Sequence, residues 1–162
     1  MEHKFGIFQT VEELNKAAAA QKAEGDEEAL YALAAENGIA GEDVEDYLDG
    51  SAEELATPLM AALGKLDLEA AELGLESQLA DWKDCIASMC AEDDGLCRAV
   101  FAPGKELVHV LAEGIKHASR TRTVLSDRIA ELAGVPRRSA IGMTGRDDLR
   151  RIAENYYLGV KR

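Results

Sequence analysis

Residues 104–120, GKELVHVLAEGIKHASR, form the most strongly periodic apolar segment of the chain. Its apolar side chains recur mostly at spacings of three and four, so they share one broad face of a helix. They are Leu107, Val108, Val110, Leu111, Ile115 and Ala118. Pro103 and Gly104 mark the start, because neither residue belongs in a helix interior. We expect this helix to be buried and to hold an acidic half of the chain beside a basic half.

The composition also favours helices over strands. The chain has 162 residues, enough for one domain or for one domain with a small appendage. Alanine and leucine dominate its apolar content, whereas aromatic and β-branched residues are sparse. We therefore predict an all-α fold, a small multi-helix bundle around a central helix near residues 105–119.

The N-terminal part of this bundle is predicted to be a three-helix module. Turn signals with glycine separate short helices that we expect at residues 11–24, 27–36 and 42–48. Residues with capping side chains mark helix starts here and later in the chain, at Thr10, Thr57, Ser126 and Thr144. We divide the chain into an acidic N-terminal module, residues 1–75, and a helical region with a basic C-terminal end, residues 76–162.

Charge is distributed unevenly along the chain. Residues 1–99 carry 24 acidic and 6 basic side chains, a net charge of −18. Residues 100–162 carry 7 acidic and 12 basic side chains, a net charge of +5, so the whole chain has −13. This asymmetry argues against nucleic-acid binding through the whole surface. It permits a basic contact surface near the C-terminus, or an acidic surface that binds a basic groove of a protein.

The densest acidic segment lies in the third predicted helix and just after it. Seven carboxylates could imitate the phosphate spacing of a nucleic acid and dock in a basic channel of a protein. They are Glu42, Asp43, Glu45, Asp46, Asp49, Glu53 and Glu54. Solvated helix faces are the commoner cause of such a pattern, and the sequence leaves both interpretations open.

Residues 126–141, SDRIAELAGVPRRSAI, have the pattern of a helix-turn-helix motif. Ala130, Gly134 and Val135 supply the small residue, the glycine and the apolar plug of a tight interhelical turn. Two arginines directly after the turn would open the recognition helix, which contacts bases and phosphates. The candidate nucleic-acid-binding residues are Arg128, Arg137, Arg138, Arg146, Arg150 and Arg151. A basic connector that pairs with the acidic half is the alternative interpretation.

The sequence contains no recognisable catalytic or metal-binding motif. It has no glycine-rich phosphate loop, nucleophile elbow or kinase signature. Cys85 and Cys90 are about 140° apart around a helix, so they would not converge on one ion. C-x-x-C and H-E-x-x-H pairs are also absent. We therefore expect no enzymatic activity, no bound metal and no cofactor.

The cysteines and the apolar runs bear on the cellular compartment. Residues 1–10 lack the apolar core of a signal peptide, and no apolar run approaches the length that spans a bilayer. The chain has three cysteines, an odd number, which we expect to be reduced thiols. We therefore expect a cytoplasmic protein without a membrane partner.

Several features of the C-terminal half occur together: Lys105 before the central helix, the end of that helix at Ala118, the step Ser126-Asp127, and the final Ala153, Tyr156 and Tyr157. In these features, residues 79–159 resemble the PcfK-like family of conjugative plasmids and other mobile elements. The resemblance implies an accessory protein of mobile DNA. Some relatives in that family resemble inhibitors of the type II CRISPR nuclease, which holds nucleic acid in a positively charged channel. The family offers no catalytic residue to carry over.

Two functional hypotheses follow, and both describe a non-catalytic protein that acts by binding a macromolecule. The first is an inhibitor that binds a protein partner, a nucleic-acid enzyme, as anti-CRISPR proteins do. The second is a DNA-binding accessory protein of conjugation or phage that uses the helix-turn-helix-like basic segment. The sequence leaves the identity of the partner and the oligomeric state open.

Overall fold

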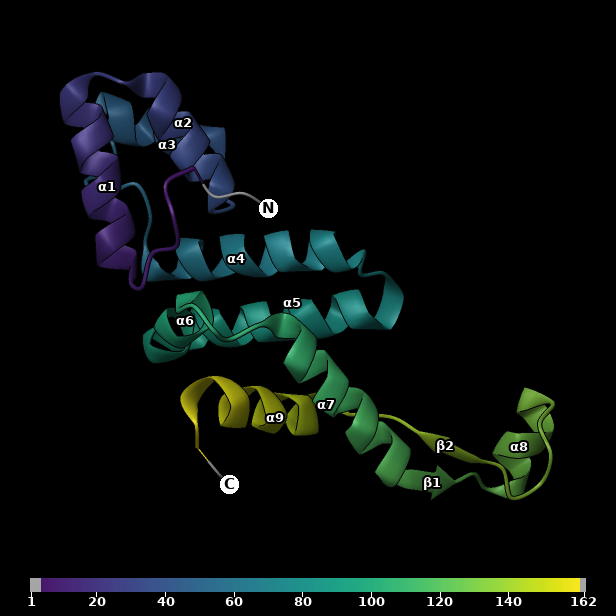
Figure 1. Cartoon of the computed structure of the whole chain (residues 1–162). Coiled ribbons are helices and arrows are strands. Elements are labelled where there is room, and N and C mark those ends of the chain that lie inside the picture. Colours follow the sequence, from purple (N-terminus) through teal and green to yellow (C-terminus); the bar gives the residue numbers. More distant parts are fainter. Residues whose placement is uncertain (1–3, 161–162) are drawn as a thin grey trace.

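A computed structural model describes residues 4–160 of the chain and confirms the all-α prediction (Figure 1). Within those residues, nine helices are joined by short loops, and two strands form one small antiparallel sheet. The elements are α1 (Val11–Glu24), α2 (Glu27–Glu36), α3 (Gly41–Asp49), α4 (Pro58–Leu73), α5 (Ser77–Glu92), α6 (Asp94–Phe101), α7 (Leu107–Arg120), β1 (Arg122–Val124), α8 (Asp127–Ala133), β2 (Ala140–Gly142) and α9 (Arg146–Leu158).

Capping side chains set several helix starts where the sequence predicts them. The Thr10 hydroxyl accepts a hydrogen bond at 3.2 Å from the backbone N–H three residues later. Thr57 caps α4 in the same way, with a proline at the first helical position, and Ser126 caps α8. The predicted cap at Thr144 is wrong, because Gly145 directly precedes α9 and the Thr144 hydroxyl is bonded to another helix.

Helices α1, α2 and α3 form the predicted N-terminal three-helix module and supply most of a first hydrophobic cluster. Helix α2 contacts both α1 and α3. Residues 55 and 56, Ala61 of α4 and Phe101 of α6 complete this first cluster. Its fully buried side chains include Leu14, Leu30, Leu33, Val44 and Leu55. Burial of each such side chain contributes roughly 1.5–3 kcal/mol, so the module has a substantial core.

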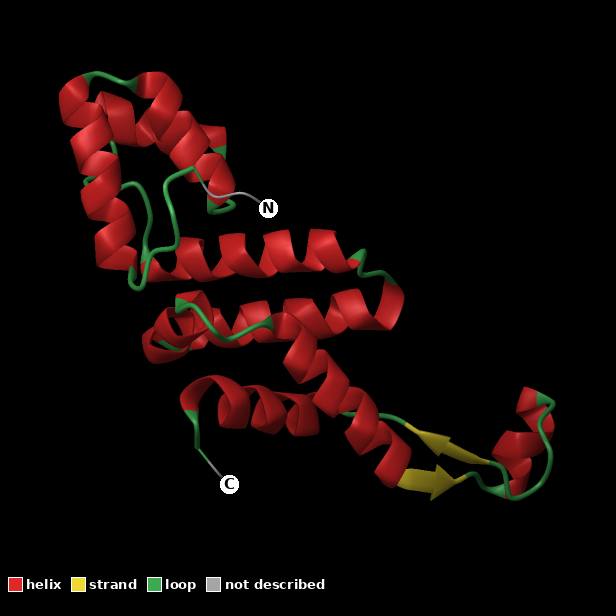
Figure 2. Ribbon diagram, in the orientation of Figure 1, coloured by secondary structure: helices red, strands yellow, loops and turns green. Residues whose placement is uncertain are grey.

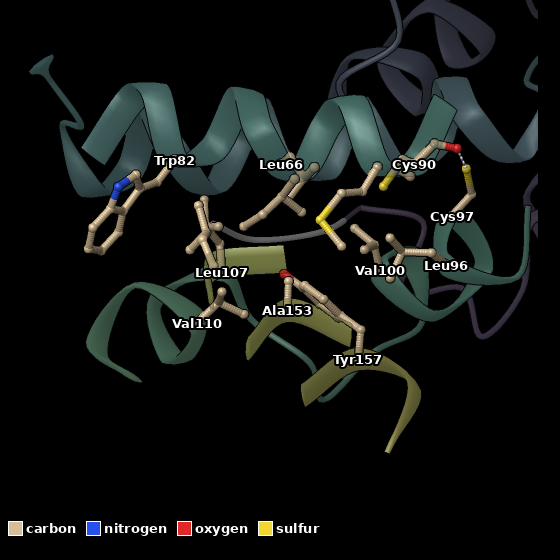
Figure 3. Packing of buried hydrophobic residues seen from close by; sticks show 14 of the residues in the cluster. Leu66, Trp82, Cys90, Leu96, Cys97, Val100, Leu107, Val110, Ala153 and Tyr157 are labelled. Carbon is tan, nitrogen blue, oxygen red and sulfur yellow. Dashed lines mark hydrogen bonds between the residues drawn. The ribbon is translucent and has the colours of Figure 1, made fainter. Parts of the chain in front are cut away.

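A second hydrophobic cluster lies between α4, α5, α6, α7 and α9. Figure 3 shows Leu66, Trp82, Leu107 and Tyr157 converging on it from different ribbons. The side chain of Trp82 is only 8% exposed, which confirms the prediction that the single tryptophan belongs to the core. Because α9 packs here, the chain returns to the body after the excursion that follows α7.

Helix α4 is the element that takes part in both clusters. Ala61 packs in the first cluster, whereas Ala62 and Leu66 pack in the second. Where α4 passes the loop after α2, the two backbones are in close contact: a Cβ on Gly64 would lie 2.3 Å from the Asn37 carbonyl oxygen. The division of the chain at residue 75 stays a prediction. Helix α4 lies before that boundary, but the helices it contacts most are α5, α6 and α7, which follow it.

Helix α7 forms where the sequence predicts it, but it is buried on a narrower face. Leu107, Val110 and Leu111 are buried in the second cluster. The predicted burial of Val108 and Ile115 is wrong, because these side chains are 41% and 51% exposed. The buried positions of α7 are Leu107, Val110, Leu111 and Gly114, a single stripe at spacings of three and four. Helix α7 contacts α4, α5 and α9, and β2 as well.

Residues 121–145, which we call the arm, leave the body between α7 and α9. Figure 2 shows that the two strands and α8 extend beyond the packed helices. Strand β1 pairs with β2 in antiparallel register, with Thr123 opposite Ile141, and α8 lies at the far end of the pair. The arm and the N-terminal module lie at opposite ends of the elongated molecule (Figure 1).

Candidate binding surfaces

The seven predicted acidic residues lie on α3 and on the loop that follows it. All are exposed except Asp43, which is half-buried. Val44 and Tyr47 are buried on the opposite face of α3 and hold the helix to the module. Within residues 4–160, none of the seven carboxylates takes part in an ion pair. The module therefore presents an exposed acidic face whose carboxylates form no ion pair in those residues.

Local hydrogen bonds keep this acidic face in a defined shape. The Asp49 carboxylate accepts the Ser51 backbone N–H at 2.8 Å, and hydrogen bonding to Ser51 holds the pKa of Asp49 below its usual value. Glu54 accepts a hydrogen bond from the Asn15 amide at 3.3 Å. Lys22 lies 4.3 Å from the centre of the Tyr47 ring and donates to the Tyr47 carbonyl oxygen, and its charge contributes to the lowered pKa of Asp49. The carboxylates stay available to a positively charged partner.

The six predicted arginines separate into two groups. Arg150 and Arg151 lie on α9 and pair with carboxylates of the chain itself. Arg150 is 2.7 Å from Glu92, and Arg151 is 2.9 Å from Asp148. The other four are exposed and form no ion pair in the described residues; they are Arg128, Arg137 and Arg138 on the arm and Arg146 at its base. Two of the six arginines are thus already paired with carboxylates of the chain, and four are not.

The recognition helix of the predicted helix-turn-helix motif does not form. Helix α8 corresponds to the first helix of the motif, and Gly134 ends it in a left-handed conformation. Residues 135–139 then make an irregular turn, and residues 140–142 are β2. Arg138 has a φ of 64°, which an α-helix excludes. The physical reason is length: glycines at 142 and 145 leave too few residues to nucleate a second helix, whereas β1 offers a pairing edge.

Two close contacts fix the base of the arm, and sequence reasoning missed both. A Cβ on Gly142 would lie 1.9 Å from the Ala118 carbonyl oxygen, so only glycine lets β2 lie against the end of α7. The Thr144 hydroxyl donates to the Gly114 carbonyl oxygen at 2.6 Å and is buried, 5% exposed. In the sequence, the only sign of these contacts is a glycine at 142 followed closely by Thr144. The same two residues are equally typical of a loop that ends a helix.

Two clefts flank Trp82 at the base of the arm. One has a volume of about 360 Å³, and its lining includes Arg146, Asp81 and Asp84. The other has a volume of about 230 Å³, and its lining includes Ile115, Arg122 and Met143. The second cleft explains why Ile115 is exposed: it faces a hollow between α7 and the arm. This end of the molecule combines free cationic side chains with exposed apolar ones.

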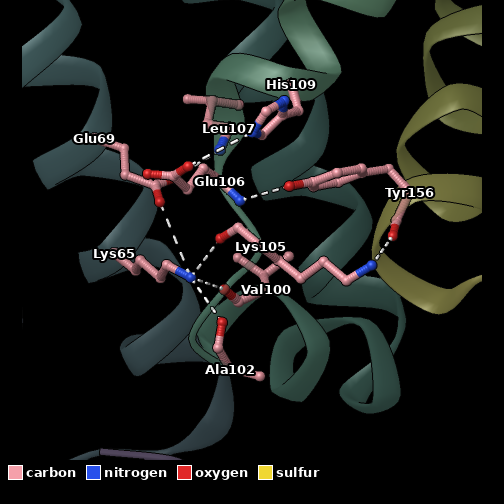
Figure 4. Close-up of polar contacts among 9 residues, drawn as sticks. All are labelled: Lys65, Glu69, Val100, Ala102, Lys105, Glu106, Leu107, His109 and Tyr156. Carbon is pink, nitrogen blue, oxygen red and sulfur yellow. Dashed lines mark hydrogen bonds and ion pairs between the residues drawn. The ribbon is translucent and has the colours of Figure 1, made fainter. Parts of the chain in front are cut away.

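A polar junction anchors the linker between α6 and α7 (Figure 4). Glu69 accepts the Leu107 backbone N–H at 3.0 Å and so caps α7. The Lys65 ammonium donates to the carbonyl oxygens of Val100, Ala102 and Lys105 at 2.8, 2.9 and 2.7 Å. Burial lowers the pKa of Lys65 and raises that of Glu69, because desolvation outweighs their mutual attraction across 3.9 Å. Both side chains bind backbone groups of the linker, so their role is structural.

Lys105 and Tyr156, two of the residues singled out in the sequence of the C-terminal half, contact each other in this junction. The Lys105 ammonium donates to the Tyr156 carbonyl oxygen at 2.8 Å and lies 4.8 Å from the centre of the Tyr156 ring. The Tyr156 hydroxyl in turn accepts the Glu106 backbone N–H at 2.9 Å. Lys105 and Tyr156 thus connect the start of α7 to the end of α9. This structural contact explains why a lysine and a tyrosine occupy these two positions.

Two of the three cysteines, Cys90 and Cys97, are buried thiols in the second cluster. The Cys97 thiol donates to the Cys90 carbonyl oxygen at 2.9 Å, and both residues are buried. Burial raises the pKa of Cys90 to about 12, so its thiolate is scarce at neutral pH. Within residues 4–160, no three His, Cys, Asp or Glu side chains converge to hold a metal ion.

Comparisons with known proteins add no assignment to this picture. No family model, curated protein or solved structure matches the chain. In residues 4–160, no helix combines the length and the apolar content that crossing a bilayer requires. A function must therefore be inferred from the acidic face of the N-terminal module and from the arm.

Proposed function

We propose that the chain is a non-catalytic binding protein whose acidic face docks on a positively charged, nucleic-acid-binding groove of a protein partner. The observation that carries the proposal is the set of seven carboxylates on α3 and the following loop, none of which is paired within the described residues. Fixed negative charges of this kind accelerate encounter with a basic surface and add affinity that falls with salt.

The distribution of charge over the molecule supports a partner outside the chain. Residues 1–57, which end before α4, hold 15 acidic and 3 basic side chains, a net charge of −12. The arm with its free arginines lies at the other end of the molecule (Figure 1). The chain therefore does not neutralise its own acidic face, and a basic partner would gain the full electrostatic attraction.

The resemblance to the PcfK-like family makes the partner class more specific. We propose that the chain comes from a mobile element and inhibits an RNA-guided type II CRISPR nuclease. Such a nuclease holds its nucleic acid in a positively charged channel, which suits an acidic, rigid module. Inhibition by occupation of that channel needs no catalytic residue, only the shape and the charge of the face.

A cleavage assay tests this proposal. The purified chain is added to a type II CRISPR nuclease with guide and target DNA, and cleavage and co-purification are measured as salt is raised. We expect inhibition by the natural chain and its loss when Glu42, Asp43, Glu45 and Asp46 are replaced together by Gln or Asn. A matched variant that replaces Glu24, Glu28, Glu72 and Glu76, also exposed, by Gln removes the same charge elsewhere and should still inhibit.

Comparing the two charge-matched variants distinguishes binding through the acidic face from a general effect of negative charge. Equal inhibition by both variants would show that the acidic face of α3 is not the docking surface. Absence of inhibition and of co-purification with the natural chain would reject the inhibitor proposal itself. Circular dichroism of each variant checks that the helical content of the chain is kept.

A further inference from the structure

The arm concentrates positive charge on a chain that is otherwise strongly acidic. Residues 121–145 contain four arginines and two carboxylates, a net charge of +2, whereas the whole chain has −13. Arg122, Arg128, Arg137 and Arg138 are exposed and take part in no ion pair within residues 4–160. Because salt screens exposed charges beyond about 10 Å, the distant acidic face does not cancel this local field.

The arm is also preorganised, so it presents these arginines in a fixed arrangement. Its base is held by the contacts of Gly142 and Thr144 with α7. At its far end, Ala130 is fully buried, and the Leu125 N–H donates to the Ser139 carbonyl oxygen at 2.8 Å. The backbone then closes a turn from Pro136 to Ser139, which displays two arginines side by side. Binding through a preformed arm loses little conformational entropy.

Exposed aliphatic side chains accompany the arginines. Ile129 is 55% exposed and Leu132 is 81% exposed, and they lie three residues apart on the same side of α8. Residues 121–145 contain no aromatic side chain, so the arm lacks the stacking platform that proteins use for single strands. Aliphatic side chains beside arginines are instead found where proteins enter the minor groove of a duplex and press on its base steps.

The same features discriminate between possible occupants of this surface. A second arm from another copy would cover the aliphatic residues, but it would bring two positively charged segments together. Double-stranded DNA offers rows of phosphates on both sides of a groove whose floor is less polar. A duplex therefore fits both the charge and the apolar edge of the arm.

We propose that the arm binds double-stranded DNA without base specificity. The four free arginines contact phosphates, and the edge of α8 formed by Ile129 and Leu132 enters a groove. This surface is separate from the acidic face, and it needs no recognition helix. Its partner is DNA itself, so the proposal does not depend on inhibition of a nuclease.

Fluorescence anisotropy with a labelled duplex of about 20 base pairs tests the proposal between about 50 and 200 mM salt. Four arginine–phosphate contacts predict a logarithmic salt slope of about −3.6, which is a loss of roughly 150-fold in affinity over that range. Replacing Arg128, Arg137 and Arg138 by Gln leaves one contact and a slope of about −0.9. Leu132→Ser should weaken binding by about tenfold with the natural slope, because it removes apolar contact and no charge.

The double variant Arg150→Gln with Arg151→Gln is the control, because these arginines are already paired with Glu92 and Asp148. It should keep the natural slope, and circular dichroism confirms that each variant is folded. The proposal is overturned if the natural chain does not bind the duplex at the lowest salt, or if the arm variant keeps the natural slope. It is also overturned if a single strand of equal length binds more tightly. Arm-dependent self-association in sedimentation, without DNA binding, would identify a protein surface instead.

Discussion

The Tyr157 hydroxyl is a buried polar group without a hydrogen-bond partner in the described residues. It lies in the second cluster, and burial raises its pKa. Because an unsatisfied buried hydroxyl carries a desolvation cost with no compensation, Tyr157→Phe should raise the free energy of unfolding by about 1 kcal/mol. Urea denaturation followed by circular dichroism measures this change.

The neighbouring Tyr156 provides the matched control. Its hydroxyl accepts the Glu106 N–H, so Tyr156→Phe leaves that donor without its partner and should lower the free energy of unfolding by about 1 kcal/mol. The two substitutions remove the same hydroxyl group, but they should change the free energy of unfolding in opposite directions. A loss of stability in both variants would mean that the Tyr157 hydroxyl has a partner in solution.

Single residues also show what the sequence alone can supply. The residue types of the two candidate surfaces, seven carboxylates and six arginines, were identifiable from their density along the chain. Their partners were not, because Arg150 pairs with Glu92 across 58 residues and a helical pattern does not encode such contacts. Arg128 and Arg150 look alike in the sequence and differ in whether a carboxylate is already bound.

At the scale of elements, the contact of β2 with α7 sets the direction of the arm. In Gly142→Ala the new Cβ would lie 1.9 Å from a backbone carbonyl oxygen, which cannot move like the end of a side chain. We expect a loss of about 2 kcal/mol in stability, typical of an overpacked site, and faster amide exchange across residues 121–145. Hydrogen exchange with mass spectrometry resolves the arm from the helices of the body.

Gly145→Ala is the control for that substitution, because no atom lies within 4 Å of the added Cβ. The arm should then exchange at the natural rate. Equal protection of the arm in both variants would show that β2 does not need the close approach to α7.

Elements whose signals are local were predictable, and those that depend on distant pairing were not. Helix α7 followed from spacing, although its apolar residues allow a wider face than the one that is covered, so Val108 and Ile115 were misplaced. The helix-turn-helix prediction was wrong because residues 140–142 pair with β1, which precedes α8, and local periodicity does not encode pairing across an intervening helix. A run of three residues carries too little periodicity to identify a strand.

For the whole molecule, the acidic and basic ends were predictable from charge counts, whereas the way the clusters are joined was not. Helix α4 contributes to both clusters, and it reads in the sequence as an ordinary alanine-rich helix interrupted by Gly64. The glycine would be expected to weaken the helix by about 1 kcal/mol relative to alanine. The reason for a glycine at this position is the close contact with the loop after α2, which the sequence does not reveal.

Gly64→Ala sets these two effects against each other. Helix propensity favours alanine by about 1 kcal/mol, but the added Cβ would lie 2.3 Å from the Asn37 carbonyl oxygen and 2.9 Å from that of Gly38. Overpacking against backbone on this side should cost more, about 3 kcal/mol, so stability should fall by about 2 kcal/mol. We expect α1, α2 and α3 to exchange amide hydrogens faster while α5 and α9 remain protected. Gly41→Ala at the start of α3, with its nearest atom at 3.7 Å, has room and should stabilise instead. A gain in stability for Gly64→Ala would show that the N-terminal module is not seated on α4 through this contact.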